Sequence, residues 1–145
     1  KIMNNNVKSN LWLSKASIPY LKKNQKGSII IISSIAGLQG LKNLGAYSIS
    51  KTADIGLIRS LAVELGSKNI NVNALCPGII KTEFARALWE NPEILKDVED
   101  NAPLKRIGSP DEVAGAAILL ASDPGSFITG QVITMDGGIT ISGRG

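Results

Sequence analysis

The stretch "SIIIIS", residues 28–33, is a short unbroken run of isoleucines between two serines. Runs of this length and kind are typical of strands that are buried on both faces, as in a parallel sheet. Two further segments have strand character: "INVNAL" at residues 70–75, which "CPG" ends, and residues 131–135, which two glycines follow. The sequence therefore predicts three strands, the first of them fully buried.

Apolar residues at helical spacing fill the segments around these strands. Residues 2 to about 24 fit a helix with one buried face and with Pro19 near its end, and the spacing returns from about residue 45 to residue 68. Residues 83–100 indicate one or two short helices divided at Pro92. A serine N-cap, a proline at the first helical position and acids in the first turn predict a helix over residues 109–122.

This alternation of helices and strands is typical of a parallel sheet with right-handed crossovers and helices on both faces. The 145 residues, 43% of them hydrophobic and 19% charged, suit one compact globular domain. The net charge of +4 comes from scattered lysines without a dense basic run, so we expect no nucleic-acid partner. No apolar run approaches the ~20 residues of a membrane helix, so we expect no membrane association.

The chain has no histidine and a single cysteine, Cys76. A Ser-His-Asp or Cys-His nucleophile system and a Cys/His zinc site are therefore excluded within it, and we expect no metal site. No disulfide can form within the chain, which suits a reducing, cytoplasmic location. We expect Cys76 to behave as a small buried apolar residue.

The stretch "LGAYSISKTADIG", residues 44–56, contains the chemically most suggestive pair. Tyr47 and Lys51 are four residues apart, so a helix places them on one face. A tyrosine exchanges a proton near neutral pH only where a nearby cation stabilises its phenolate form. Taken alone, however, the pair is a common coincidence and leaves two polar residues on one helix face as the simpler explanation.

Several motifs in order resemble the short-chain dehydrogenase/reductase family. A strand runs into "ISSIAG", "YSISK" begins thirteen residues after Ser34, and "NVNALCPGIIKT" follows, while "NNNVKSN" lies upstream. "RIGSPDEVAGAAILLAS" and "ITGQVITMDGG" resemble the C-terminal helix and last strand of that family. The resemblance covers nearly the whole chain and implies a Rossmann-like doubly wound α/β fold. It also implies hydride transfer between a nicotinamide cofactor, NAD or NADP, and a small-molecule carbonyl compound or secondary alcohol.

The resemblance implies a catalytic role for each of four residues. Tyr47 is the general acid/base on the substrate oxygen, and Ser34 hydrogen-bonds the same oxygen. Lys51 binds the nicotinamide ribose and stabilises the phenolate. Asn6, preferred to Asn5 because a valine follows it, holds a water that relays protons from Lys51 to solvent.

The same resemblance implies a cofactor cradle and a substrate lid. Pro77, Gly78 and the backbone of Ile80 lie against the nicotinamide ring in such enzymes, and the Thr82 hydroxyl reaches the carboxamide or the phosphates. Residues 83–101, with Phe84, Leu88 and Trp89, correspond to the lid. Plain surface packing is the alternative for that segment; as a lid, Leu88 and Trp89 favour an apolar carbonyl compound over a sugar.

The glycine-rich turn that receives the cofactor pyrophosphate in this family is absent, because the glycines of "AGLQG" are misplaced for it. Lys1, rather than a methionine, opens directly into a helical pattern. We therefore expect residues 1–145 to be the catalytic and substrate-facing C-terminal part of a single domain whose N-terminal dinucleotide-binding half is missing. Such a chain would bind dinucleotide poorly, show little activity and expose an unpaired sheet edge prone to aggregation.

Two other functions remain open at this point. Ser48 and Lys51 form an S-x-x-K pair, the signature of serine-lysine hydrolases, but the S-D-N and K-T-G elements of that class are absent. A non-catalytic relative could instead serve as a binding or assembly subunit, although nothing structural requires all four residues Asn6, Ser34, Tyr47 and Lys51. Relatives commonly form tetramers through two long helices and the C-terminal strand, so we expect a homotetrameric parent protein.

Overall fold

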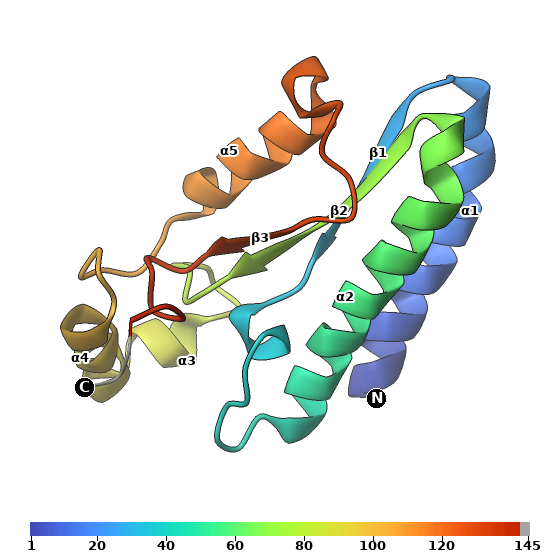
Figure 1. The fold of residues 1–145 in the computed structure, drawn as a ribbon. Helices are drawn as coiled ribbons and strands as arrows, with labels where there is room; N and C mark the ends of the chain where they lie inside the picture. Colours follow the sequence, from blue (N-terminus) through green and yellow to red (C-terminus); the bar gives the residue numbers. More distant parts are fainter. Residues whose placement is uncertain (143–145) are drawn as a thin grey trace.

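A three-stranded parallel sheet forms the centre of the protein, whose structure is a computed structural model describing residues 1–142. The strands are β1 (Gly27–Ile32), β2 (Ile70–Pro77) and β3 (Val132–Met135), and they lie side by side in sequence order (Figure 1). Gly27 pairs with Ile70, and Ala74 pairs with Val132. The predicted α/β fold with a parallel sheet is confirmed.

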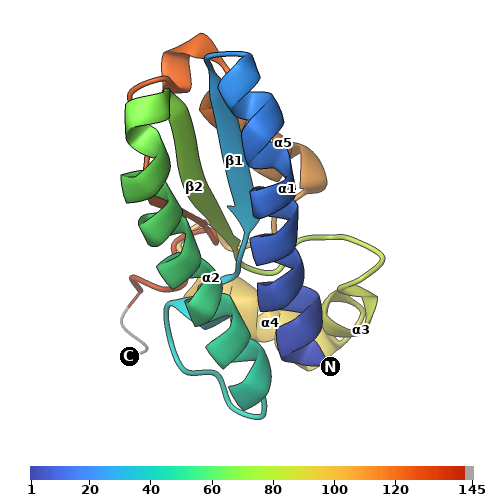
Figure 2. The same cartoon turned by 90° about the vertical axis from the view of Figure 1, so that its right-hand side faces the viewer.

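Helices cover both faces of this sheet. Helices α1 (Ser9–Lys23) and α2 (Gly45–Leu65) pack side by side on one face, and α5 (Pro110–Ala121) lies on the other (Figures 1 and 2). Helices α3 (Arg86–Trp89) and α4 (Pro92–Asn101) lie beyond the carboxyl ends of the strands. A π-helical turn precedes α1, and three short 3-10 turns complete the list: Asn4–Lys8, Ile35–Gly37, Gly66–Lys68 and Asp123–Gly125.

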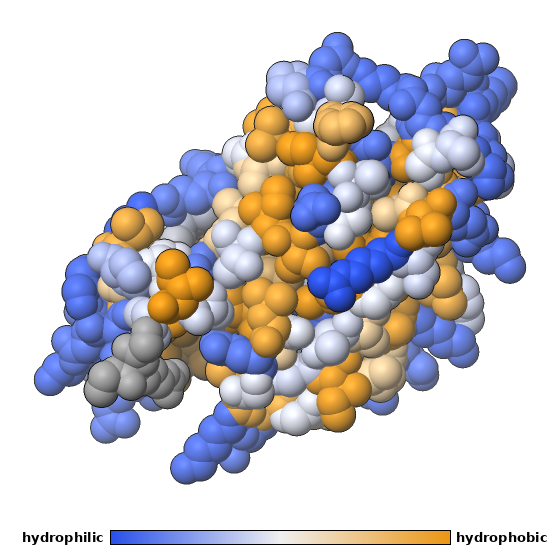
Figure 3. Space-filling view, in the orientation of Figure 1, coloured by the Kyte–Doolittle hydropathy of each residue, from blue (hydrophilic) through white to orange (hydrophobic). Residues whose placement is uncertain are grey.

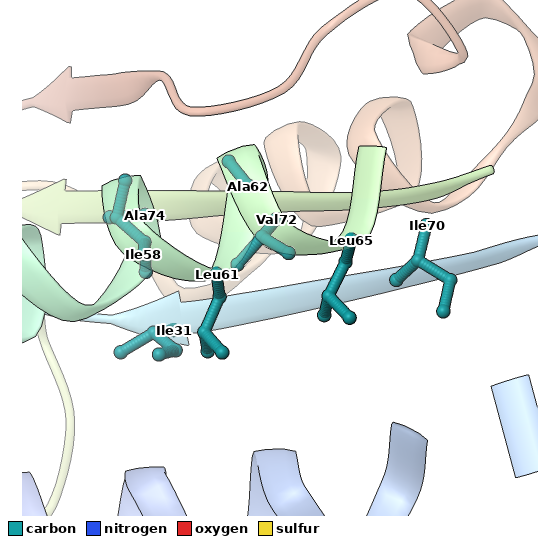
Figure 4. Close-up of a cluster of buried hydrophobic side chains, with 8 residues drawn as sticks. All are labelled: Ile31, Ile58, Leu61, Ala62, Leu65, Ile70, Val72 and Ala74. Atoms are coloured by element: carbon teal, nitrogen blue, oxygen red, sulfur yellow. The ribbon is translucent and has the colours of Figure 1, made fainter. Parts of the chain in front are cut away.

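The main core fills the space between α2 and the sheet (Figure 4). Because residues three and four apart share a helix face, one side of α2 supplies a continuous apolar row to this core. The core consists of Ile31, Ile58, Leu61, Ala62, Leu65, Ile70, Val72 and Ala74. It holds α2 rigidly on the sheet, and α2 is the helix that contains Tyr47 and Lys51.

The expectation that the strand at residues 28–33 is buried on both faces was wrong. Within the described residues β1 pairs only with β2, and its side chains are half-buried, with Ile32 49% exposed. The central strand β2 is the buried one, including the polar Asn73. The Asn73 amide is satisfied there by donating to Ile128 O and accepting from the Gln131 N–H.

The helix predicted over residues 2–24 forms but does not bury the apolar face expected of it. Ile18 and Leu21 pack against the core, whereas Leu11 and Leu13 are exposed and Ser14 is the buried residue of α1. Apolar residues occupy more than one side of this helix, so those that face away from α2 and β1 remain at the surface.

The ends of several other elements also differ from prediction. Strand β2 runs two residues further, to Pro77, because its last residues still pair with β3. The α-helix predicted to residue 68 ends at Leu65 and continues as a 3-10 turn, which Asn69 closes in the left-handed conformation at φ 56°. Helix α5 begins as predicted, with a capping box between Ser109 and Glu112.

Candidate active site

The loop after β1 is fastened tightly to the first half of α2. Ser33 is buried, and its hydroxyl donates to the carbonyl of Lys51 across 2.8 Å. Thr52 Oγ1 donates to the carbonyl of Gly37 across 3.0 Å. A β-carbon on Gly37 would lie 2.7 Å from the Lys51 carbonyl carbon, so only glycine permits this approach. These contacts fix the backbone of Lys51 relative to the end of β1.

The Lys51 ammonium is held at the carboxyl end of β1. Its Nζ donates to the carbonyl of Ile32 across 2.8 Å and lies 5.8 Å from the centre of the Tyr47 ring. The Lys51 side chain is only 12% exposed, so water screens its charge weakly. Tyr47 is half-buried, and among residues 1–142 its hydroxyl has no hydrogen-bond partner. The predicted pairing of Tyr47 and Lys51 on one helix face is therefore present.

Asn6 reaches the same helix from the π-helical turn. Its Nδ2 donates to Ser50 Oγ across 2.9 Å, and Ser50 Oγ donates to the carbonyl of Tyr47 across 2.7 Å. Ser50 is fully buried. Single π-helical turns occur frequently at functional sites. Ser50 was not recognised from the sequence, although its place between Tyr47 and Lys51 in "YSISK" was a usable signal.

Ser34 begins the 3-10 turn Ile35–Gly37 as its N-cap, and its Oγ accepts a hydrogen bond from the Ala36 N–H across 3.1 Å. This turn packs against α2, as does the π-helical turn that contains Asn6. The four residues predicted to act together, Asn6, Ser34, Tyr47 and Lys51, therefore lie on elements that meet at one place. That place is the carboxyl end of β1 and the first half of α2.

The predicted cofactor cradle, Pro77 to Thr82, is the loop that leaves the neighbouring strand. Pro77 is the last residue of β2, and the Gly78 N–H donates to the carbonyl of Met135 across 3.0 Å. Ile80 forms a parallel bridge with Gly108, which fastens the loop to the segment before α5. Thr82 is half-buried, and its hydroxyl accepts from the Ala85 N–H across 3.3 Å. Open α/β sheets bind ligands at this end of their strands.

The predicted lid is tethered to the cradle through a tryptophan. The indole Nε1 of Trp89 donates to the carbonyl of Thr82 across 2.8 Å, and the Lys81 ammonium lies 5.4 Å from the Trp89 ring. Leu88 is 44% exposed and Phe84 is almost fully exposed. The structure therefore gives Trp89 a definite protein partner, while Leu88 and Phe84 present apolar surface to solvent.

Two buried ionisable groups, Asp54 and Cys76, lie close to Lys51. Burial raises the pKa of the Asp54 carboxyl, and the Asn10 amide and the Lys51 ammonium oppose that rise. Burial also raises the pKa of the Cys76 thiol, which is fully buried as expected. Asp54 was not recognised from the sequence; the signal was its position among the apolar residues of the buried helix face.

The serine-lysine arrangement is not assembled. Ser48 Oγ is buried and has no hydrogen-bond partner within residues 1–142. The Lys51 ammonium contacts Ile32 O and Asp54 instead. A lysine bound in this way is not placed to remove a proton from Ser48.

Two kinds of feature are absent from the described part of the chain. No cluster of three or more His, Cys, Asp or Glu side chains there is arranged to bind a metal ion. Residues 1–142 also contain no helix with the length and hydropathy needed to cross a membrane.

Comparison with known proteins places the chain in a family. A protein-family model described as enoyl-(acyl carrier protein) reductase matches residues 1–140. Dehydrogenase/reductase SDR family member 4 from Bos taurus is 44% identical over 138 residues, which are 95% of this chain and 50% of that protein. The chain therefore belongs to the short-chain dehydrogenase/reductase family, whose oxidoreductases depend on NAD(P).

Solved structures agree in fold. A 7α-hydroxysteroid dehydrogenase complexed with NADH and 7-oxo glycochenodeoxycholic acid superimposes with a TM-score of 0.88 at 38% identity, over 92% of this chain and 52% of that one. A candidate NAD(P)-dependent gluconate 5-dehydrogenase from Beutenbergia cavernae, with NADP bound at low occupancy, gives 0.92 at 34%, over 97% and 56%. The chain spans about half the length of the curated relatives it matches, and its fold is the corresponding portion of a Rossmann-like fold.

Proposed function

We propose that residues 1–145 form the catalytic and substrate-facing part of an NAD(P)-dependent dehydrogenase/reductase. The reaction is hydride transfer between nicotinamide and a carbonyl compound or secondary alcohol, with Tyr47 as the general acid/base. The observation that supports this most strongly is the placement of Lys51. Its ammonium is poorly exposed, anchored on Ile32 O and beside the Tyr47 ring, as a phenol that must exchange a proton requires.

The donors at this end of the sheet fit a nicotinamide nucleotide. Lys51 has three N–H donors and Ile32 O accepts one, so donor capacity remains for a ribose hydroxyl. Pro77, Gly78 and Ile80 offer a largely apolar loop for a flat ring. The Thr82 hydroxyl donates only a long hydrogen bond of 3.5 Å to the carbonyl of Ile80, so it can turn to an amide or phosphate oxygen. When bound, the nicotinamide supplies or accepts the hydride, and the protein positions and polarises the reactants.

The other steps of the reaction would be carried out by residues of this chain, each with its own role. In carbonyl reduction the Tyr47 hydroxyl donates its proton to the substrate oxygen, and Ser34 Oγ donates a hydrogen bond to the same oxygen. The Lys51 charge stabilises the phenolate that Tyr47 becomes. Asn6, held by Ser50, supports the backbone around a water that returns a proton through Lys51. In alcohol oxidation each proton moves in the opposite direction.

The exposed apolar side chains of Leu88 and Phe84 support an apolar carbonyl substrate. They lie on and before α3, next to the cradle that Trp89 fastens. A closing lid that carried them over the nicotinamide would exclude water from the reacting atoms.

A variant at Tyr47 tests the reaction directly. Tyr47→Phe in the intact protein removes the proton donor and keeps the ring, so carbonyl reduction with NADH or NADPH should fall by at least about a hundredfold. Cofactor affinity, measured by quenching of protein fluorescence, should stay within a few-fold of wild type. Unchanged turnover would remove Tyr47 from the mechanism and favour a non-catalytic binding or assembly role.

We also propose that the intact protein is a homotetramer. Large apolar side chains remain exposed on α1 and α2, and Figure 3 shows apolar side chains gathered over α5 and β3 on another face. The exposed large apolar residues include Leu11, Trp12, Leu13 and Tyr20 on α1, Ile49 and Val63 on α2, and Ile118 and Leu119 on α5. Analytical ultracentrifugation should find a tetramer that Leu13→Glu dissociates; a monomeric wild type would refute this assembly.

A further inference from the structure

Asp54 is a fully buried carboxylate whose two oxygens have different surroundings. Oδ1 accepts a hydrogen bond from Asn10 Nδ2 on α1 across 2.9 Å. Oδ2 accepts no hydrogen bond from any residue in the range 1–142, yet it lies 3.6 Å from Lys51 Nζ. A buried carboxylate oxygen without a hydrogen bond is costly, so its presence on the apolar face of α2 requires a reason.

The contact with Lys51 is electrostatic rather than a formed hydrogen bond. A separation of 3.6 Å exceeds the usual length of an N–H···O bond, and it is within the range of an ion pair. The Lys51 side chain is 12% exposed and that of Asp54 is 0% exposed, so little water lies between the charges. Together, Ile32 O and Asp54 hold the ammonium from two elements, β1 and α2.

Three groups face the Asp54 carboxylate from the elements packed around it. Lys51 lies one turn earlier on α2, Asn10 faces it from α1, and the Cys76 thiol on β2 lies within electrostatic range of both Asp54 and Lys51. Burial disfavours the charged form of Asp54, while Asn10 and Lys51 favour it. An ionised Asp54 therefore depends on its partners, and in return it places a negative charge beside the lysine.

We propose that Asp54 is a positioning residue that holds Lys51 at the carboxyl end of β1 and offsets part of its charge, so that it sets the pH range in which Tyr47 can accept a proton from an alcohol. This rests on the proposed function. The Lys51 charge favours the phenolate, and a carboxylate at 3.6 Å from that charge opposes its effect. Removing the negative charge leaves the cation uncompensated, so the base form of Tyr47 persists to lower pH.

The decisive experiment is the pH dependence of alcohol oxidation by the intact protein. Asp54→Asn keeps the size and the hydrogen-bond capacity toward Asn10 but removes the charge. The pH of half-maximal kcat should fall by about 0.5–1 unit, while the plateau stays within a few-fold of wild type. Glu64→Gln removes the same charge from an exposed position on α2 and should leave the profile unchanged. Coincident profiles for wild type and Asp54→Asn would overturn the proposal.

A second measurement does not depend on activity. Carbon-13 NMR of the Asp54 carboxyl should show titration above the ordinary range of an aspartate. Lys51→Met should raise that titration further, because the stabilising cation is lost. If the titration of the Asp54 carboxyl is the same in wild type and in Lys51→Met, the proposed ion pair is refuted. If the intact protein proves inactive, this result still stands, so failure of the proposed reaction and failure of the ion pair are distinguishable.

Asp54→Leu covers the case in which the amide variant does not fold. It fits the apolar face of α2 and removes the oxygen that accepts no hydrogen bond, although Lys51 then loses its ionic partner, which lowers stability. Its pH profile should shift in the same direction as that of Asp54→Asn. A profile at the wild-type position would again count against a role for the Asp54 charge.

Discussion

The side-chain amide of Asn6 donates a hydrogen bond to the buried hydroxyl of Ser50 across 2.9 Å. Ser50 in turn donates to the carbonyl of Tyr47 across 2.7 Å. A π-helical turn near the start of the chain is thereby joined to the helix that contains the proposed acid/base. Asn6 and Ser50 are far apart in sequence but support the same backbone. The effects of removing them on the free energy of unfolding should therefore be coupled.

Ser50→Ala tests this connection. The substitution leaves the Asn6 amide without its partner in a partly buried site, so the free energy of unfolding should fall by about 1–2 kcal/mol. A double-mutant cycle with Asn6→Ala should give a coupling energy of about 1 kcal/mol, measured by urea denaturation. Ser60→Ala on the exposed face of α2 should change stability by less than about 0.5 kcal/mol. Strict additivity of Ser50→Ala and Asn6→Ala would show that the hydrogen bond does not couple them.

Gly37→Ala tests the close approach of the loop after β1 to α2. A β-carbon there would lie 2.7 Å from the Lys51 carbonyl carbon and 3.0 Å from the Thr52 nitrogen, and backbone atoms cannot move aside easily. We expect a loss of about 1–3 kcal/mol in stability. Turnover should fall by about tenfold or more because Lys51 is displaced. Gly40→Ala, whose β-carbon meets nothing within 4 Å, is the matched control; equal effects at both glycines would contradict the packing described.

Trp89→Phe tests the tether between lid and cradle. The variant keeps an aromatic ring but loses the N–H that donates to Thr82 O across 2.8 Å. The KM for the carbonyl substrate should rise about 3- to 10-fold, with kcat changed less, because one hydrogen bond contributes about 1 kcal/mol. Trp12→Phe on α1 serves as the control for losing an indole, since Trp12 is 58% exposed. If both variants have the same kinetics, the hydrogen bond of Trp89 does not contribute to substrate binding by the lid.

The ion pair of Glu112 with Arg106 predicts that the stability of the folded state falls at acid pH. A hydrogen bond from Arg106, supported by the Ser109 N–H, lowers the pKa of Glu112 from 4.5 to about 2. A lowered pKa stabilises the folded state above pH 4.5, and that stabilisation is lost as the pH falls through about 2. The urea midpoints of wild type and Glu112→Gln should therefore differ at neutral pH and converge at the acid end. A difference between wild type and Glu112→Gln that stays constant with pH would argue against the hydrogen bond from Arg106.

Dinucleotide binding by a chain of residues 1–145 alone should be weak. The sequence has no glycine-rich turn between a strand and a helix to receive the pyrophosphate. Calorimetry with NADH and with NADPH is expected to detect no micromolar binding and no measurable turnover. A micromolar dissociation constant would mean that the loop from Pro77 to Thr82, with Lys51, suffices to bind the cofactor.

The order of the elements and the motifs around Tyr47 could be predicted from the sequence because they depend on local patterns. The isoleucine run at residues 28–33 becomes β1, and the serine, proline and acids at residues 109–112 begin α5. The spacing of Tyr47 and Lys51 needed only a helix to bring the two side chains together.

The polar contacts within the fold could not be predicted, because they depend on which faces meet. Ser50 and Asp54 look like ordinary polar residues until the π-helical turn places Asn6 against Ser50 and α1 places Asn10 against Asp54. The same limitation applies to β1, whose isoleucines cannot reveal that the strand pairs only with β2 in the described part. Whether a residue is buried depends on the elements that pack against it. A local sequence pattern shows only that a segment is apolar enough to be buried.

The pairing of Gly27 with Ile70 and of Ala74 with Val132 has a consequence for how the molecule assembles. Within residues 1–142 no two strands are joined by a short turn, so each pair of strands can form only after a segment distant in the sequence is available. Loops of this length are slow to close, and sheets that depend on them fold slowly. During synthesis, β1 and α1 must remain without the central strand until α2 has been made. The helix that contains Tyr47 and Lys51 is thus also part of the crossover that brings β2 to β1.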